Sequence, residues 1–299
     1  MTIALGGRIH ITEVAPRDGL QNLPGVLPLK EKLDFIQALC GAGCEEIEAA
    51  SFVNPKWVPQ FADAQELCAA LETQTNGVVF TYLVPNYKGA QRAIDAGAKQ
   101  LFVTTSASEK HCHDNLNQTL EQVLEGAERI AELCREKNVV YTASIATAFG
   151  YSPDPMPVPP ERVLSMIARM EKAGFGAVTL CDTSGEAKPE GVYALCRAAV
   201  ESTSLPIGVH LHQNDGVELE NALAALEAGV RIFESAAGGL GGCPFIANAR
   251  GNIATEKLIA LLEEQNYSTG IDKARMAECA ETAARIRTVY GCPPEGCNT

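Results

Sequence analysis

Eight short apolar runs rich in β-branched residues recur along the chain about every 30 to 40 residues. Between them lie segments whose apolar residues follow helical spacing, such as Leu29, Leu33, Ile36 and Leu39. Eight strands alternating with eight helices in 299 residues favour an α/β fold, a closed parallel (β/α)₈ TIM barrel, over an open doubly wound sheet. The strands are expected at Ile9–Val14, Glu45–Ala49, Val78–Val84, Gln100–Thr104, Val139–Ile145, Ala177–Cys181, Pro206–Leu211 and Val230–Ser235.

Glycines mark the ends of several helical segments, as in "GAGC", "DAGAK", "KAGFG" and "EAGVR". No GxGxxG motif follows the first strand, which argues against a dinucleotide-binding sheet. No linker or change in composition divides the chain, so we expect one domain over residues 1–299. The barrel is expected over about residues 8–265, followed by an additional C-terminal helix and a short tail over about 270–299.

Composition excludes several classes of function. A net charge of −13 and a pI near 4.9 argue against a nucleic-acid binder or a protein that binds membranes through basic residues. No run of 18 apolar residues and no signal peptide is visible, which predicts a cytoplasmic protein. The 11 cysteines show no repeating framework and are expected to be mostly reduced core residues.

Polar and reactive residues gather where the predicted strands end, the face at which TIM barrels carry their active sites. Arg17 and Asp18 follow the first strand, and Glu48 is expected to end the second. Asp182 is expected at the end of the sixth, and the pair His210 and His212 at the end of the seventh. A glycine-rich loop carrying Cys243 follows the eighth, so all these side chains are expected around one mouth.

The two histidines of "HLHQND" are the strongest indication of a metal site. Alternate residues of a strand point to the same side, so His210 and His212 project together while Leu211 faces the helices. Histidines at a strand end are about as often hydrogen-bonded structural residues, and Asp18 is the additional ligand that favours metal. Two imidazoles with oxygen ligands suit Mg²⁺, Mn²⁺, Co²⁺, Zn²⁺ or Fe²⁺.

Two loops add reactive groups at the mouth. In "EVAPRDGLQN", Pro16 and Gly19 are expected to fix a turn in which Arg17 binds a carboxylate or an oxyanion, the alternative being a solvated ion pair with Asp18. In "GGLGGCPF", Cys243 is expected to be a reactive thiol on a loop whose glycines suit a tight turn, a phosphate cradle or a lid.

Two further groups of ligand-type residues are not expected to bind a metal ion or to form a specific redox site. "HCHDN" (residues 111–115) has the same histidine spacing, but a loop or a first helical turn does not aim both rings at one point, so we interpret it as a polar loop. Cys292 and Cys297 in the tail suit a redox pair, although exposed tail cysteines usually have no specific role.

Several of these stretches together resemble the 3-hydroxy-3-methylglutaryl-CoA lyases, metal-dependent carbon–carbon lyases built on a TIM barrel. The resemblance covers nearly the whole chain. It rests on "EVAPRDGLQN", "IEAASFVNPKWVPQ", "VPNYKGAQRAIDAGAK", "CDTSG", "VHLH" and "GGLGGCPFIANARGNIATE". It implies cleavage of 3-hydroxy-3-methylglutaryl-CoA, or a close 3-hydroxyacyl-CoA, to acetyl-CoA and acetoacetate or a related oxo acid. It further implies an acyl-CoA substrate, a role in leucine degradation and a homodimer.

The resemblance also implies roles for individual residues. A divalent cation, Mg²⁺ or Mn²⁺ first, is expected on Asp18, His210, His212 and Asn252. Arg17 is expected to stabilise the enolate oxygen and Cys243 to protonate the enolate. Glu48 and Asp182 are expected to support substrate binding and proton transfer, an aspartate or histidine beside the metal to act as base, and Gln21 and Asn115 to contact substrate.

The sequence departs from the family pattern around the ligands. Gln213 and Asn214 follow the histidines where the family usually has aspartate and threonine, and are expected to support the imidazoles. The loop Gly150–Pro155 and the dipeptide Leu23–Pro24 also differ. These differences bear more on which acyl group the substrate carries than on the type of reaction.

Three alternatives remain open from the sequence. One is a condensing enzyme or an aldolase for a free oxo acid on the same barrel, against which the cysteine loop argues. Another is a lyase for a different β-hydroxyacyl-CoA. A third is a catalytically silent barrel that binds an acyl-CoA or an organic acid. The joint presence of Arg17, Asp18, both histidines, Cys243 and Asn252 argues against it.

Overall fold

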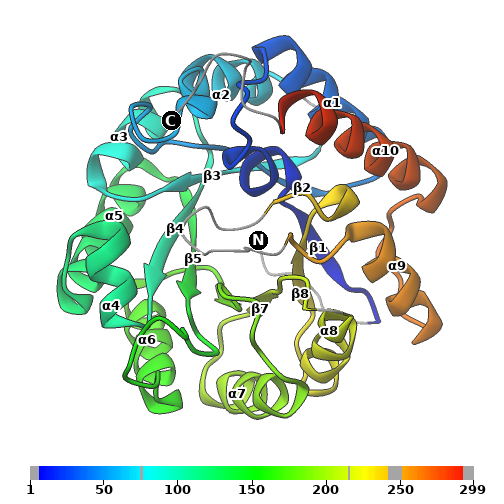
Figure 1. Ribbon diagram of the computed structural model, residues 1–299. Coiled ribbons are helices and arrows are strands. Elements are labelled where there is room, and N and C mark those ends of the chain that lie inside the picture. Colours follow the sequence, from blue (N-terminus) through cyan, green and yellow to red (C-terminus); the bar gives the residue numbers. More distant parts are fainter. Residues whose placement is uncertain (1–6, 75–76, 215, 242–250, 292–299) are drawn as a thin grey trace.

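Eight parallel strands close into a barrel in the order of the chain (Figure 1). In this computed structural model residues 7–74, 77–214, 216–241 and 251–291 are described. The strands are β1 His10–Glu13, β2 Glu46–Ser51, β3 Val79–Val84, β4 Gln100–Ser106, β5 Val140–Ala146, β6 Val178–Cys181, β7 Ile207–His210 and β8 Ile232–Ser235. Each coincides with one of the eight apolar runs, so the predicted TIM barrel is confirmed.

Helices surround the strands in Figure 1 and cover the outer face of the barrel. They are α1 Leu29–Gly41, α2 Ala64–Glu72, α3 Tyr87–Asp95, α5 Leu120–Lys137, α6 Pro160–Ala173, α7 Pro189–Ser202, α8 Val217–Glu227 and α9 Thr255–Glu264. Each buries an apolar stripe, as α6 does with Val163, Ile167 and Met170. Gly174 ends α6 with φ 83°, the left-handed conformation predicted from the glycine after this helix.

The predicted additional helix is α10, Lys273–Tyr290, which lies beside α1 and α9 (Figure 1). At its end the carbonyl oxygen of Tyr290 accepts a hydrogen bond of 2.9 Å from Gly25 N, so α10 is tied to the loop after β1. The expected tail, with Cys292 and Cys297, lies outside the described residues. The assignment of the whole chain to one domain stays a prediction.

Five short helical turns occur in loops that follow strands. They are η1 Ala15–Gly19, η2 Pro59–Phe61, α4 Glu109–His111, η3 Cys112–Leu116 and η4 Ala237–Gly239. They shape the mouth at the carboxyl ends of the strands.

The interior agrees with the class predicted from composition. Seven cysteines are buried free thiols, as expected of reduced core residues: Cys44, Cys68, Cys112, Cys134, Cys181, Cys196 and Cys279. Among the helices of the described residues, none has the length and apolar character required to cross a membrane.

Candidate active site

His210 and His212 lie together at the mouth, as their strand spacing predicts. β7 ends at His210, and His212 continues the chain in a bridge with Asn252. Both histidines are 6% exposed, and their ring centroids are 4.9 Å apart. Leu211, between them, is buried in the apolar core. The extended backbone therefore directs both rings to the same side.

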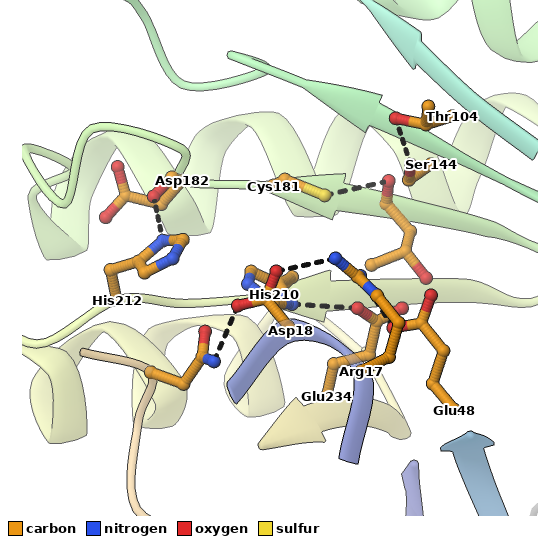
Figure 2. A network of polar contacts seen from close by, with 12 residues as sticks. Arg17, Asp18, Glu48, Thr104, Ser144, Cys181, Asp182, His210, His212 and Glu234 are labelled. Atoms are coloured by element: carbon orange, nitrogen blue, oxygen red, sulfur yellow. Dashed lines mark hydrogen bonds and ion pairs between the residues drawn. The ribbon is translucent and has the colours of Figure 1, made fainter. Parts of the chain in front are cut away.

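Each imidazole is oriented by an acceptor on its Nδ1 atom (Figure 2). His210 Nδ1 lies 2.8 Å from Glu234 Oε2, and His212 Nδ1 lies 2.7 Å from the carbonyl oxygen of Asp182. Because a carbonyl oxygen only accepts, His212 carries its proton on Nδ1, and a carboxylate assigns the same tautomer to His210. The Nε2 lone pairs are thus left for a ligand, which is the usual arrangement of metal-binding histidines.

The turn η1 brings Arg17 and Asp18 to the same place. Pro16 is the second residue of this π-helical turn, and the backbone N–H groups of Arg17, Asp18 and Gly19 all point to the carbonyl oxygen of Val14 at 2.8–3.3 Å. A side chain at Gly19 would press against Leu240. Pro16 and Gly19 thus both lie in the turn that carries Arg17 and Asp18, and their predicted role in fixing it stays a prediction.

Asp18, His210 and His212 form the one cluster of at least three His, Cys, Asp or Glu side chains in the described chain that could hold a metal ion. Their ligand atoms lie within 4.8 Å of one another. Burial acts to raise the pKa of Asp18, but Arg17 and the two histidines outweigh it and lower that pKa to about 2. Asp18 is therefore an anion at neutral pH, as a cation ligand must be.

Asn252 completes the donor set. It is fully buried, and its Nδ2 atom donates to Asp18 Oδ2 at 2.8 Å and to the carbonyl oxygen of Leu240 at 2.9 Å. Its Oδ1 atom is buried and has no hydrogen-bond partner among the described residues. A buried amide oxygen without a donor costs free energy unless something binds it. The four side chains suit a divalent cation of the kind that binds imidazole nitrogen and oxygen together.

Arg17 lies between two carboxylates. Its Nη1 is 2.6 Å from Asp18 Oδ1, and its Nη2 is 2.6 Å from Glu48 Oε2 (Figure 2). Burial acts to lower the pKa of Arg17, but the carboxylates of Glu48 and Asp18 outweigh it, and the pKa lies above its ordinary value. Its Nε is buried without a hydrogen-bond partner in the described part of the chain. One N–H of a fixed cation thus remains for an oxyanion.

Glu48 does not end its strand as predicted. β2 continues to Ser51, and its pairing with β3 resumes at Ala50 after a shift of register that follows Glu48. Burial raises the pKa of Glu48 to about 7, although Arg17 opposes this. Glu48 is thus a buried carboxyl that titrates near neutral pH, next to the expected enolate site.

Asp182 follows β6 and is 1% exposed. Its Oδ1 accepts hydrogen bonds from the backbone N–H groups of Glu186 and Ala187 at 3.0 and 3.1 Å, and burial raises its pKa to about 6. In Figure 2 the carboxylate lies on the side of His212 away from Arg17. The carbonyl oxygen of Asp182 therefore orients His212. The role of the Asp182 carboxylate in proton transfer stays a prediction.

The glycine stretch after β8 packs directly on these residues. A Cβ atom at Gly241 would lie 3.0 Å from Asp18 Oδ2 and collide with Asn252 Nδ2. Gly241 also has φ 120°, so no other residue is suited to this position. Cys243 lies outside the described residues, and its role as an acid stays a prediction.

The remaining predicted positions lie in loops of the mouth. Gln21 is half-buried just after η1, and Asn115 is half-buried in η3 after β4. The "HCHDN" segment lies in the polar loop after β4, as predicted. It forms the short turns α4 and η3, in which Cys112 is buried. Ser108 caps α4 by accepting a hydrogen bond from His111 N.

Gln213 supports the site differently from the prediction. Its Nε2 donates to the carbonyl oxygen of Asn252 at 3.1 Å, and its backbone N–H donates to that of Gly251 at 2.8 Å. Asn214 Nδ2 lies 3.3 Å from the carbonyl oxygen of Ala187. None of these three hydrogen bonds reaches an imidazole, because the chain turns away from the strand direction after His212. Gln213 therefore holds the segment that carries Asn252.

Two glutamates at the site were not predicted from the sequence. Glu234 on β8 pairs in register with His210 on β7 and binds its imidazole. Glu13 is fully buried and accepts hydrogen bonds from Ala15 N, Ala237 N and Thr255 Oγ1 at 2.7–2.9 Å, which joins the loops after β1 and β8. The sequence feature that could have identified both glutamates is a carboxylate within an otherwise apolar strand.

Known proteins are similar to this chain in sequence. A family model described as HMGL-like matches residues 8–283. A hydroxymethylglutaryl-CoA lyase of Bacillus subtilis is 33% identical over 275 residues, covering 92% of this chain and 91% of the relative. An (R)-citramalyl-CoA lyase of Chloroflexus aurantiacus is 35% identical over 283 residues, covering 91% and 89%.

A solved structure agrees closely as well. It is that of an HMG-CoA lyase from Acinetobacter baumannii in complex with coenzyme A and 3-methylmalate. It is 36% identical, superposes with a TM-score of 0.89, and the match covers 99% of this chain and 95% of that one. The chain therefore belongs to the HMGL-like family, as a lyase of the hydroxymethylglutaryl-CoA lyase type.

Proposed function

We propose that this protein is a divalent-cation-dependent carbon–carbon lyase that cleaves 3-hydroxy-3-methylglutaryl-CoA to acetyl-CoA and acetoacetate. The observation that carries the proposal is the cluster of half-buried Asp18 with buried His210 and His212, beside Arg17. The relatives named hydroxymethylglutaryl-CoA lyase support the substrate.

Asp18, His210 and His212, with Asn252 Oδ1, are the residues that would hold the cation. A bound divalent cation polarises a substrate oxygen and makes the loss of a hydroxyl proton easier. Mg²⁺ or Mn²⁺ is proposed first, because two of the four donors are oxygen atoms of a carboxylate and an amide.

Cleavage begins with loss of the proton from the tertiary hydroxyl group. As the carbon–carbon bond breaks, that oxygen becomes the ketone oxygen of acetoacetate, and the electron pair of the bond moves to the thioester as an enolate. The unpaired Nε–H of Arg17 is placed to donate to the enolate oxygen, because Asp18 and Glu48 already hold the other two nitrogens. A proton added to the enolate carbon then gives acetyl-CoA.

The proton acceptors available are groups of this chain. Glu48 has a pKa of about 7 and a second oxygen, Oε1, that no described donor contacts, so it can take or return a proton near neutral pH. An aspartate or histidine of the ligand cluster is the other proposed base. Cys243 is proposed as the acid for the enolate, and Gln21 and Asn115 as substrate contacts.

A second substrate has a specific observation in its favour. The Chloroflexus aurantiacus relative named (R)-citramalyl-CoA lyase is as similar to this chain as the hydroxymethylglutaryl-CoA lyases are. Citramalyl-CoA carries the same arrangement of a tertiary hydroxyl group and an acyl thioester, so the same charges are needed for its cleavage.

The experiment is to incubate the protein with each thioester, Mn²⁺ and a thiol reductant, and to measure acetyl-CoA. We expect acetyl-CoA and acetoacetate from 3-hydroxy-3-methylglutaryl-CoA, loss of the reaction in EDTA, and recovery on adding Mn²⁺. If citramalyl-CoA is cleaved to acetyl-CoA and pyruvate while 3-hydroxy-3-methylglutaryl-CoA is not cleaved, the proposed substrate is wrong and the proposed type of reaction stands. No acetyl-CoA from either thioester would contradict the proposal.

A homodimer and a role in leucine degradation stay predictions from the resemblance, and a cytoplasmic location stays a prediction from the sequence.

A further inference from the structure

The additional helix α10 contacts the glycine turn that precedes the expected lid. Gly238 and Gly239 of this turn both have left-handed backbone conformations, with φ 63° and 60°. A Cβ atom at Gly238 would lie 3.1 Å from the carbonyl oxygen of Ala280 on α10. The path of the turn is therefore determined in part by a helix that lies outside the barrel.

Charged side chains from three different elements hold the polar backbone groups of the turn. Glu13 accepts from Ala237 N at 2.9 Å, and Glu256 accepts from Gly238 N at 3.1 Å. On the carbonyl side, Arg287 Nη2 donates to Gly239 O at 3.0 Å and lies 3.4 Å from Gly238 O. Arg287 is thus the cation that complements two carboxylates on the opposite side of the turn.

This turn also fixes the amide of Asn252. The carbonyl oxygen of Leu240, the next residue, accepts from Asn252 Nδ2, and Asp18 accepts the other N–H. Because both acceptors are oxygen atoms, the amide must direct Nδ2 towards them and Oδ1 away from them. Loss of the Leu240 contact would allow the amide to rotate and to withdraw Oδ1 from the ligand cluster.

We propose that Arg287 of α10 is a positioning residue for the metal ligand Asn252, acting through the turn Ala237–Leu240. The proposal rests on the proposed function only in requiring a cation at Asp18, His210, His212 and Asn252. It assigns a role to α10 in binding the cation, through hydrogen bonds to backbone carbonyl groups rather than through contact with the cation or the substrate.

The test is the affinity of the purified protein for Mn²⁺ alone, measured through the electron paramagnetic resonance signal of free Mn²⁺. Arg287→Ala is expected to weaken binding about tenfold, as loss of a residue that supports a ligand typically does. Arg285→Ala is the matched control, since Arg285 lies on the same helix and its side chain contacts Thr282 of that helix. We expect Arg285→Ala to bind Mn²⁺ as the wild type does.

A double-mutant cycle separates positioning from a general loss of stability. If Arg287 acts through Asn252, Arg287→Ala has no further effect on Mn²⁺ affinity in an Asn252→Ala background. An unchanged affinity in Arg287→Ala, an equal loss in Arg285→Ala, or additive losses in the double variant would each overturn the proposal. Wild-type protein that fails to bind Mn²⁺ would overturn the proposed metal site as well.

Discussion

The chain carries two His-x-His pairs, and the structure treats them differently. His210 and His212 are both buried, and each Nδ1 has an oxygen acceptor. His113 has a side chain that is 78% exposed, and His111 packs edge-on against Tyr151 with ring centroids 5.2 Å apart. The spacing in the sequence is identical, so the spacing alone does not identify a metal site.

The difference arises from the backbone. Residues two apart on a strand point the same way, whereas residues two apart on a helical turn point to nearly opposite sides. His210 ends β7, but His111 and His113 lie in α4 and η3. The lesson is that a ligand pair must be assigned together with its secondary structure.

A low pKa does not distinguish His212 from His111. Burial lowers the pKa of His212 to about 4, and it lowers the pKa of His111 to about 4 as well. What distinguishes them is a fixed partner on the far nitrogen, since Nδ1 of His111 is buried without a hydrogen-bond partner among the described residues.

Removal of a proposed metal ligand should produce the largest difference between the two histidine pairs. His212→Ala removes one imidazole from the cluster and is expected to reduce kcat roughly 10³-fold, because metal stabilisation is worth several kcal/mol. His113→Ala is the control from the other pair and should retain full activity. Steady-state kinetics with the acyl-CoA substrate provide the measurement, and equal losses in the two variants would contradict the assignment.

Arg17 tests the buried cation beside the strand-end pair. Arg17→Lys cannot maintain both ion pairs and the Nε–H, so kcat should fall about 10²-fold, as on removal of an oxyanion donor. Mn²⁺ affinity should change much less, since Arg17 is not a ligand. A variant with normal kcat would show that Arg17 does not stabilise the enolate.

His111 tests the pair that lies outside the site, through pH. Its pKa is about 4 in the folded protein against 6.5 in the unfolded chain, so the unfolded chain binds more protons between these values. The stabilising contribution of the neutral ring is complete above pH 6.5 and is lost as pH falls towards 4.

His111→Phe keeps the ring contact with Tyr151 and removes this titration. From pH 7 to pH 5 the wild type should lose at most about 2 kcal/mol more free energy of unfolding than the variant. Urea unfolding of both proteins in EDTA measures the difference. Parallel pH profiles would show that the His111 ring is not buried as described.

Substitution of Glu234, which orients His210, is expected to have the smallest effect of these changes. Glu234→Gln keeps an acceptor for His210 but removes its charge, and Mn²⁺ affinity should fall about tenfold. The control is Glu46→Gln, since Glu46 binds His10 at 2.8 Å at the opposite end of the barrel. Binding titrations should show no effect of this control, and an effect of similar size would attribute the loss to stability.

The fold could be predicted because each strand is a continuous apolar run between helical segments. The clustering of His210, His212 and Asp18 could be predicted because all three lie at or just after the ends of such runs. Asn252 came from the resemblance alone, since the position of its segment beside His212 depends on a bridge between distant parts of the chain.

Glu234 and Glu13 could not be assigned, because their roles depend on tertiary neighbours. Glu234 meets His210 through the register of β7 with β8, and Glu13 reaches Ala237 across 224 positions of sequence. The end of β2 was placed too early because the change of register after Glu48 has no signature in the sequence.

The central claim is that the strand-end pair, and not its counterpart at residues 111–113, binds the catalytic cation. Anomalous diffraction from crystals soaked in Mn²⁺ tests it most directly. We expect one strong peak within bonding distance of Asp18, His210, His212 and Asn252 Oδ1. A peak at His111 and His113, or none at the strand-end cluster under conditions in which Mn²⁺ supports turnover, would contradict this account.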